Sequence, residues 1–386
     1  MSYQFTVGTY QFHKDPNLNY QMNRWLTFGN IPEEEIKQAA GRIQNLEDWK
    51  REFLLLALKA NQEGDVLQEV CCYRAIDFFM SYSDPEKESN YDRLVNLFRK
   101  AYEPYFLEGR IIELSVHYDS IHLPVWYAPP SRNGDSRKTI LMTGGFDCYK
   151  EELVPIMLYF ADHGYHFYYF EGPGQGEVLM KQHYPMTQEW EKPVKAVLDA
   201  LRLERVTLIG LSLGGYLAPR SAIDEKRIRR VIAWGPMLDF YQVVSTRRGL
   251  VTAVFLWVTV SLHLAVVMNT VLAIKMKRDP YTFWGIDHGM HVMGVETPYQ
   301  YFRKLKLFSL RKIARQVKQD FLLMTGTQDH FVDMNMYYQM ERSLTQVRSF
   351  TGRIFTEKEN AENHCQFGNL ELALRTMAAW IAAIDP

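Results

Sequence analysis

A serine flanked by glycines is the first residue of this chain that could do covalent chemistry. Gly210, Ser212 and Gly214 form the pattern Gly-x-Ser-x-Gly. A serine oxygen is presented to a substrate on a sharp turn between a strand and a helix, and the glycines allow other backbone to approach that turn closely. Residues 205–209 favour a buried strand and the residues from 216 onward favour a helix. We therefore predict Ser212 as a nucleophile; the plainer alternative is a glycine-rich turn with an incidental serine.

A serine hydroxyl is a weak nucleophile, so it needs a base, and a neutral imidazole oriented by a carboxylate serves well near neutral pH. Asp329 follows a strand-like apolar run, and His364 follows the next strand and precedes the final helix. This is the chain order nucleophile, acid, histidine of folds that use such a turn. We predict Asp329 as the acid and His364 as the base. Asp333 is the competing acid, whereas His330 adjoins the acid and cannot easily reach the serine.

A second glycine-rich loop follows the strand-like residues 138–142. Its position predicts a backbone N–H that faces the reacting carbonyl oxygen, with a second N–H from the residue after the nucleophile, Leu213. Phe146 is the preferred first donor and Gly145 the alternative. Asp147 either contacts substrate or caps the helix that follows, and the sequence favours neither.

The elements around these residues alternate between strand and helix signals. Residues 110–129 alternate apolar and polar side chains around a short turn, which predicts a hairpin. Short apolar runs separated by helical segments then predict a mostly parallel sheet with helices on both faces. The predicted strands are 138–144, 165–172, 205–212, 228–236, 320–326 and 348–356, and the predicted helices are 149–163, 190–201, 214–225, 334–344 and 369–384.

The chain divides into four segments on this reading. Residues 1–105 show helical periodicity and are predicted as an N-terminal helical domain. Residues 106–236 and 319–386 are the two parts of the α/β core, and residues 237–318 are a helical lid inserted between them. The length of 386 residues is more than one minimal α/β domain needs, which agrees with added helical segments.

One run inside the insertion, residues 249–274, contains no charged residue and is long enough for a transmembrane helix. A single span would place Ser212 on one side of the membrane, with Asp329 and His364 on the other, so the predicted site could not form. We therefore expect no membrane span. We expect one or two apolar helices that cover a substrate channel or bury the surface of a homodimer.

Lid insertions commonly line the substrate pocket. Trp257, Trp284 and His291 are predicted substrate-binding residues, although plain packing against the core is the alternative for each. Further candidates of the same kind are Phe255, Met268, Met290, His263 and His288.

Composition excludes several classes of function. The net charge is −1, so the chain as a whole has no positive field of the kind that nucleic-acid binding requires. The four cysteines fit neither a zinc site nor a secreted disulfide framework, and the first residues lack the pattern of a signal peptide. We expect a cytoplasmic protein without metal or cofactor. The basic stretch 303–318 is a solvated face or a docking patch for an acidic acyl carrier protein.

Several motifs together resemble one group of α/β-hydrolases. They are Gly144-Gly145-Phe146-Asp147, the run 171–177 (Glu-Gly-Pro-Gly-Gln-Gly-Glu) and Gly-Leu-Ser-Leu-Gly-Gly, all behind an N-terminal helical region. The group includes fungal heptaketide-shortening pigment hydrolases, a bacterial polyketide-shortening hydrolase of an anthraquinone pathway, and a C–C-cleaving pseudooxynicotine hydrolase. Glu171 departs from this pattern, because related sequences usually have aspartate there. The resemblance implies an α/β-hydrolase fold.

The resemblance also implies hydrolysis of a C–C bond in a small, polyketide-like 1,3-dicarbonyl compound through an acyl-serine, which is a retro-Claisen chain shortening. The same side chains would equally serve hydrolysis of an ester, thioester or amide of an apolar acyl group. A third hypothesis is a non-catalytic binding protein on a hydrolase scaffold. The sequence does not specify the substrate or whether a carrier protein holds it.

Overall fold

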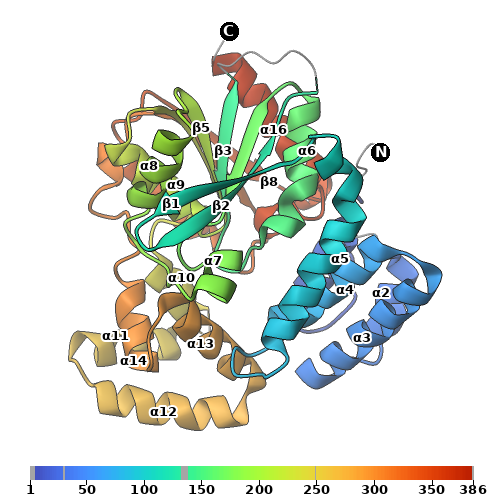
Figure 1. Ribbon diagram of the computed structural model, residues 1–386. Coiled ribbons are helices and arrows are strands. Elements are labelled where there is room, and N and C mark those ends of the chain that lie inside the picture. The colour runs from blue at the N-terminus through green and yellow to red at the C-terminus, as the bar shows by residue number, and fades with distance from the viewer. Residues whose placement is uncertain (1–4, 29–30, 132–137, 248, 385–386) are drawn as a thin grey trace.

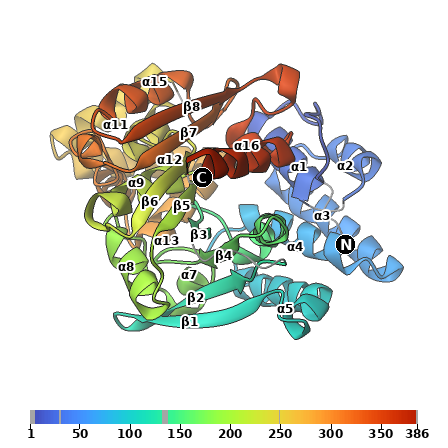
Figure 2. The same ribbon diagram turned by 90° about the horizontal axis from the view of Figure 1, so that it is seen from above.

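The computed structural model describes residues 5–28, 31–131, 138–247 and 249–384, and its centre is one eight-stranded sheet in the order β1-β2-β4-β3-β5-β6-β7-β8. Figure 2 shows this order running across the molecule from β1 to β8. From β4 to β8 the neighbouring strands are parallel, whereas β1–β2 is an antiparallel hairpin and β2 pairs antiparallel with β4. The strands are β1 (Ile112–Tyr118), β2 (Ile121–Ala128), β3 (Thr139–Thr143), β4 (His166–Phe170), β5 (Val206–Leu211), β6 (Ile228–Trp234), β7 (Asp320–Gly326) and β8 (Ser349–Phe355).

The central strands are apolar along their whole length because both faces of the sheet are covered. Every residue of β3, β5 and β7 is buried, as expected for parallel strands between two helical layers. Alternate residues of one strand belong to different cores: Ile140 and Met142 pack in one, and Leu141 packs in the other. The helices that follow the strands are α6 (Val154–Asp162), α7 (Gly176–Gln182), α8 (Glu191–Ala200), α9 (Gly214–Asp224), α15 (Met334–Ser343) and α16 (Leu370–Ile384). The predicted strands and helices are confirmed, and among the described α-helices of this part of the chain the sequence did not predict α7.

The N-terminal helices lie beside the core and share one hydrophobic cluster with it (Figure 1). They are α1 (Pro16–Phe28), α2 (Glu33–Ala40), α3 (Leu46–Glu63), α4 (Val66–Phe79) and α5 (Lys87–Leu107). The backbone N–H of Gly8 donates to Gly368 O at 2.8 Å, and Tyr20 Oη donates to His364 O at 3.2 Å. This region therefore contacts the segment that carries the predicted base. Its description as a separate domain stays a prediction, and its residues 1–4, like residues 385–386 of the last segment, lie outside the described residues.

A helical insertion follows β6 and returns to β7. It contains α10 (Phe240–Thr246), α11 (Leu250–Ser261), α12 (Ala265–Arg278), α13 (Pro280–Met293) and α14 (Pro298–Leu305). Its two ends lie side by side, because Phe240 N donates to Phe308 O at 3.0 Å and Leu310 N donates to Leu238 O at 2.8 Å. The insertion therefore leaves and rejoins the core at one place, and Figure 1 shows it beyond one end of the sheet.

The apolar run of residues 249–274 forms two helices rather than one. The chain turns between α11 and α12 at His263, whose φ of 55° no helix accommodates. Within the described ranges, no helix has both the length and the apolar character to cross a bilayer.

Candidate active site

Ser212 lies on the tight turn between β5 and α9, with a φ of 58°. Its N–H donates to Trp234 O on the neighbouring strand at 2.8 Å, which holds the turn against β6. A β-carbon added at Gly210 would lie 1.9 Å from Gly214 O, and one added at Gly215 would lie 1.9 Å from Gly235 O. The glycines are therefore required by close backbone contact around the serine.

His364 connects Ser212 and Asp329 through its two ring nitrogens. Nε2 lies 2.9 Å from Ser212 Oγ and Nδ1 lies 2.6 Å from Asp329 Oδ2. The other oxygen of Asp329 accepts the N–H groups of Phe331 and Val332, both at 2.9 Å. The loop after β7 thus fixes the carboxylate. Because the carboxylate binds Nδ1, the imidazole is oriented with Nε2 toward the serine.

The charges of this buried pair stabilise each other. Burial alone would lower the pKa of His364, but the negative charge of Asp329 and its hydrogen bond raise that pKa well above its ordinary value. Burial alone would raise the pKa of Asp329, but His364 and the N–H of Val332 lower it. Asp329 is therefore the ionised partner, and the imidazole gains a proton easily.

The competing side chains named from sequence are used elsewhere. Asp333 caps α15 by accepting the N–H groups of Asn335 and Met336 at 2.8 and 3.2 Å. His330 packs its ring against Phe331, with 4.0 Å between ring centroids. Burial lowers the pKa of His330 to about 3. Neither residue is placed to replace Asp329 or His364.

Two backbone N–H groups beside Ser212 have no partner among the described residues: those of Leu213 and Phe146. The N–H of Gly145 instead donates to Cys148 Sγ at 3.4 Å. The prediction of Gly145 as an alternative oxyanion donor is therefore wrong in this geometry, because its hydrogen is already engaged. Gly145 has a steric role, since a β-carbon there would lie 2.9 Å from Ser212 Cβ.

The glycine-rich motif 172–177 holds the loop that carries Phe146. The buried side chain of Gln175 donates from Nε2 to the carbonyl oxygens of Gly144 and Gly145 at 3.0 and 2.9 Å. Its Oε1 accepts the N–H of Gly172 at 3.0 Å. One amide therefore joins the turn after β4 to the turn after β3 and sets the direction of the Phe146 N–H.

Glu171 at the start of this motif is fully buried and accepts the N–H groups of Lys150 and Glu177 at 2.8 and 2.9 Å. Burial raises the pKa of this carboxyl to about 7, although Lys150 acts in the opposite direction. A β-carbon at Gly176 would lie 1.8 Å from Glu171 Oε1, so the glycine leaves room for the carboxyl. Glu171 belongs to the support of the loop and does not line the cavity.

A cavity of about 450 Å³ contains Ser212 and His364 in its wall, a size that suits a small organic molecule. Its wall is mainly apolar and aromatic and comes from the core, the insertion and the N-terminal region, where α1 contributes most and α4 contributes Phe79. The insertion supplies, among others, Phe240, Val243, Leu256, Leu272, Ile286 and Phe302. Helix α1 supplies Tyr20, Gln21 and Arg24, none of which the sequence analysis identified.

Arg24 brings a buried positive charge to this wall. It is 4% exposed and pairs with Glu152, which also binds Arg74 at 2.7 Å. Burial alone would lower the pKa of Arg24, but the charges of Glu152 and Asp147 raise it, so the guanidinium stays charged. Among the described residues, its Nε has no hydrogen-bond partner. The one sequence signal was that Arg24 is the only charged residue of helix α1.

The predicted substrate-binding residues divide into two groups. Asp147 and Trp284 line the cavity, and Trp284 Nε1 donates to Phe78 O at 2.8 Å. The N–H of Tyr149, at the start of the next helical turn, donates to Glu152 Oε1 at 2.9 Å. Glu152 therefore caps this turn, which was the alternative role predicted for Asp147. Trp257 is 59% exposed and lies outside the cavity wall, because α11 turns its neighbour Leu256 inward instead.

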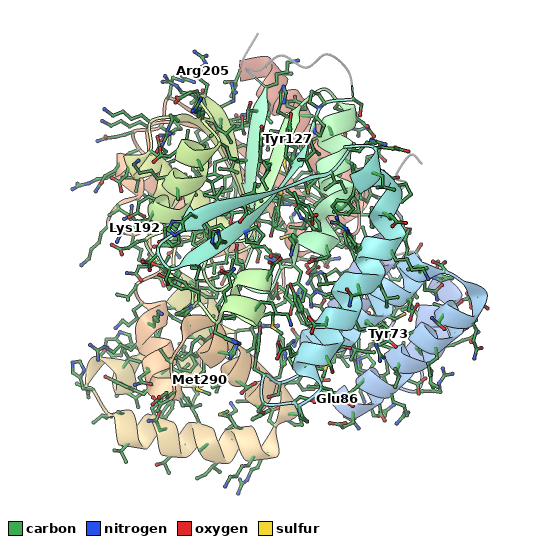
Figure 3. All side chains as sticks on the ribbon, in the orientation of Figure 1. Tyr73, Glu86, Tyr127, Lys192, Arg205 and Met290 are labelled. Atoms are coloured by element: carbon green, nitrogen blue, oxygen red, sulfur yellow. The ribbon has the colours of Figure 1, made fainter. Side chains whose placement is uncertain are left out.

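His291 also lies outside the cavity wall, because its ring stacks on Tyr82 with 3.6 Å between centroids. The residue one turn earlier, His288, lines the cavity and packs edge-on against Phe146. Its Nε2 has no hydrogen-bond partner in the part of the chain that the structure describes. Burial lowers the pKa of His288 to about 3, so its ring is neutral. Of the other candidates, Phe255, Met268 and Met290 pack in the apolar core instead; Figure 3 labels Met290 within the insertion.

Comparison with known proteins shows the family and the fold of this chain. Residues 134–351, more than half of the chain, match the family model described as serine aminopeptidase, S33. This chain belongs to that family. The S33 hydrolase is thus an enzyme of the α/β-hydrolase fold, and the predicted fold class is confirmed.

Curated relatives of this S33 hydrolase come from fungi. It is 26% identical over 370 residues to the hydrolyase poxO of Penicillium oxalicum, covering 84% of this chain and 86% of the relative. It is 30% identical over 288 residues to the 20-hydroxy-prefusarin hydrolase FUS2 of Gibberella moniliformis, covering 67% of this chain and 65% of FUS2. The resemblance to fungal pathway hydrolases is confirmed at the level of sequence.

Solved structures share the whole fold of this S33 hydrolase. The 2,6-dihydroxy-pseudo-oxynicotine hydrolase superimposes with a TM-score of 0.63 at 19% identity, covering 93% of this chain and 94% of the other. AbyA5 superimposes with a TM-score of 0.67 at 17% identity, covering 94% of each chain. Because both likenesses extend over most of the chain, the helices outside the sheet belong to the common architecture.

Gln175→Leu tests the role of the amide in holding the Phe146 loop. The change leaves two buried carbonyl oxygens without partners and frees the loop, so we expect turnover of an activated aryl ester to fall about tenfold to a hundredfold. The matched control is Gln182→Leu. Gln182 also binds backbone groups through its amide, but these are the N–H and O of His122 and not those of the Phe146 loop. Equal rates for the two variants would contradict this role of Gln175.

Proposed function

We propose that this protein is a serine hydrolase that cleaves a C–C bond beside a ketone in an apolar, polyketide-like 1,3-dicarbonyl compound. One observation carries the proposal: the chain Asp329–His364–Ser212 ends beside two unpartnered N–H groups at the wall of one cavity. A nucleophile, a base and an oxyanion site in mutual reach are the parts that acyl transfer requires.

The proposed reaction starts when Ser212 Oγ attacks a carbonyl carbon and His364 Nε2 takes the hydroxyl proton. The N–H groups of Phe146 and Leu213 bind the oxyanion that forms on the carbonyl oxygen. When the carbonyl re-forms, the C–C bond breaks and its electron pair leaves as an enolate, which the protonated His364 neutralises. Water then attacks the acyl-serine with His364 as base, releases the carboxylic acid and restores Ser212.

A carbanion leaves only if its charge is delocalised, so the substrate must carry a second carbonyl one carbon away from the scissile bond. Arg24 supports this substrate class, because its charged guanidinium lines the cavity with Nε unpartnered. A cation in a low-dielectric cavity stabilises a developing enolate oxygen strongly. The motif resemblance supports the same class, and the relation to FUS2, a 20-hydroxy-prefusarin hydrolase, supports hydrolysis of a small organic compound.

Hydrolysis of an ester, thioester or amide of an apolar acyl group is the second candidate. The same side chains would carry it, and the cavity supports it because its wall is mainly apolar. The alcohol, thiol or amine that leaves in these reactions needs a proton from His364, but it forms no enolate that a cation would stabilise. Dependence of the rate on Arg24 therefore separates the two reactions.

Delivery of the substrate by an acyl carrier protein is a further part of the hypothesis. Two members of the basic stretch 303–318 are engaged within the chain, since Lys304 Nζ donates to Met293 O at 2.5 Å and Arg311 binds Asp239 at 2.9 Å. The exposed remainder is the surface on which an acidic carrier would dock.

Ser212→Ala and His364→Ala should each lower kcat by roughly 10⁵–10⁶ with the fold intact, because the nucleophile and its base act as one unit. Fluorophosphonate labelling followed by mass spectrometry should place the adduct on Ser212 in the wild type. Wild-type turnover in either variant would refute the assignment. Absence of labelling in folded wild type would favour the non-catalytic alternative.

The pH dependence of kcat/KM should report His364. Because Asp329 raises the pKa of His364, the neutral base is populated only at higher pH, and the rate should rise with pH along a limb displaced upward from about 6.5. Asp329→Asn removes the charge that raises this pKa, so the limb should move to lower pH while the maximum falls by about 10⁴. A limb that stays in place would show that another group titrates.

Arg24→Gln should lower kcat/KM for a β-diketone by about tenfold to a hundredfold and leave an aryl ester much less affected. The comparison variant is Arg74→Gln, since Arg74 shares Glu152 with Arg24 but lies outside the cavity wall. Because Arg74 also holds Asp147 O in the loop beside Ser212, this variant should lower kcat/KM for both substrates to the same degree. A purely structural effect would lower kcat/KM for the β-diketone and for the aryl ester by the same factor in both variants. That outcome would remove Arg24 from the mechanism without touching the serine chemistry.

A further inference from the structure

The outer side of α11 and α12 carries a dense group of exposed apolar side chains. Among the described residues, nineteen large hydrophobic side chains are exposed, and ten of them lie between residues 250 and 274. Monomeric soluble proteins rarely expose such a contiguous patch, so the patch marks a contact surface. We call it the lid face; its most exposed members are Leu250 (79%), Val251 (85%), Trp257 (59%), Leu262 (64%) and Val266 (80%).

The two helices that carry the lid face are two-sided. Thr252 and Leu256 of α11, and Leu272 and Lys275 of α12, line the cavity that contains Ser212. In Figure 1 α12 forms the edge of the molecule furthest from the sheet, and in Figure 3 its side chains project outward from that edge. The lid face is thus the outer side of the cover of the cavity, and its side chains are largely exposed.

Charge identifies the kind of partner. Residues 247–278 contain five basic residues and no aspartate or glutamate; of these, Arg247 and Lys275 line the cavity and do not belong to the lid face. Lys277 and Arg278 are exposed at the end of α12, next to the apolar side chains. A two-fold contact between identical copies would bring one basic rim against another, with no acid on the face to neutralise either. An anionic lipid surface satisfies both the apolar and the basic side chains.

We propose that the lid face binds the surface of an anionic lipid bilayer, with α11 and α12 lying in the headgroup region. A helix of 12 residues is about 18 Å long, which is shorter than the hydrocarbon core of about 30 Å, so the helices lie on the membrane. Trp257 takes the position that aromatic side chains favour at the interface. The cover of the cavity then faces the lipid, which is where an apolar substrate of the proposed reaction would be concentrated.

The test is co-flotation of the full chain with lipid vesicles. We expect the wild type to float with vesicles of phosphatidylcholine and phosphatidylserine, and to float less with phosphatidylcholine alone or in high salt. The variant Val251→Asp/Val266→Asp should lose at least tenfold in partitioning, because two charges replace the two most exposed side chains of the lid face. The matched control is Leu107→Asp, since Leu107 is 81% exposed at the end of α5, away from the lid face.

Equal flotation of the wild type and the double variant, or no flotation of the wild type with either vesicle, would overturn the proposal. Sedimentation at increasing protein concentration tests whether a second copy of the chain covers the lid face. If the wild type does not float but forms a dimer, and the double variant is a monomer, the lid face is a contact between two copies. Hydrolysis of a soluble aryl ester without vesicles shows that each variant is folded. Flotation does not depend on turnover, so loss of the proposed activity and loss of this inference are separate results.

Discussion

The hydrogen bond between Ser212 Oγ and His364 Nε2 exists only because the backbone of Ser212 adopts a left-handed conformation. An L-residue in that conformation costs roughly 1–2 kcal/mol, and the cost must be offset by the surroundings. Here the N–H of Ser212 is bound by Trp234 O, and two glycines admit backbone within contact distance on either side. The parallel sheet therefore holds the serine in a conformation that a free loop would abandon.

The second constraint is the placement of buried charge. Removing ions from water costs several kcal/mol for each ion, so a buried carboxylate is retained only where its partners are fixed. Glu152 meets this condition through Arg24 of α1 and Arg74 of α4, and Arg74 Nη2 also donates to Asp147 O in the loop beside the serine at 2.5 Å. This network couples the N-terminal helices to the loop that carries the proposed oxyanion donor. The helices in front of the core are thereby part of the candidate site.

The insertion serves two environments with one pair of helices. Its inner side chains, such as Leu256 and Leu272, close the apolar cavity, whereas its outer side chains leave Val251 and Val266 uncovered. A helix that is apolar on all sides normally lies in a protein core or in lipid. Since no described helix is both long enough and apolar enough to span a bilayer, the proposed contact with a lipid surface accounts for the apolar side chains on the outer side of these helices. The same reasoning explains why 26 residues without charge form a cover and not a transmembrane segment.

The sequence by itself determined the order of strands and helices, and it identified the serine turn, the aspartate and the histidine that hydrogen bonds join in the structure. These features are local: alternation, apolar runs and glycines at fixed spacing act within a few residues of the chain. Only the tertiary structure decided which side chains share the cavity. Arg24 precedes Ser212 by more than 180 residues, and no periodicity of helix α1 indicates that its arginine turns toward the serine. The same limit misplaced His291 and Trp257, because one position along a helix changes the direction of a side chain by about 100°, and only packing against a neighbour selects the direction.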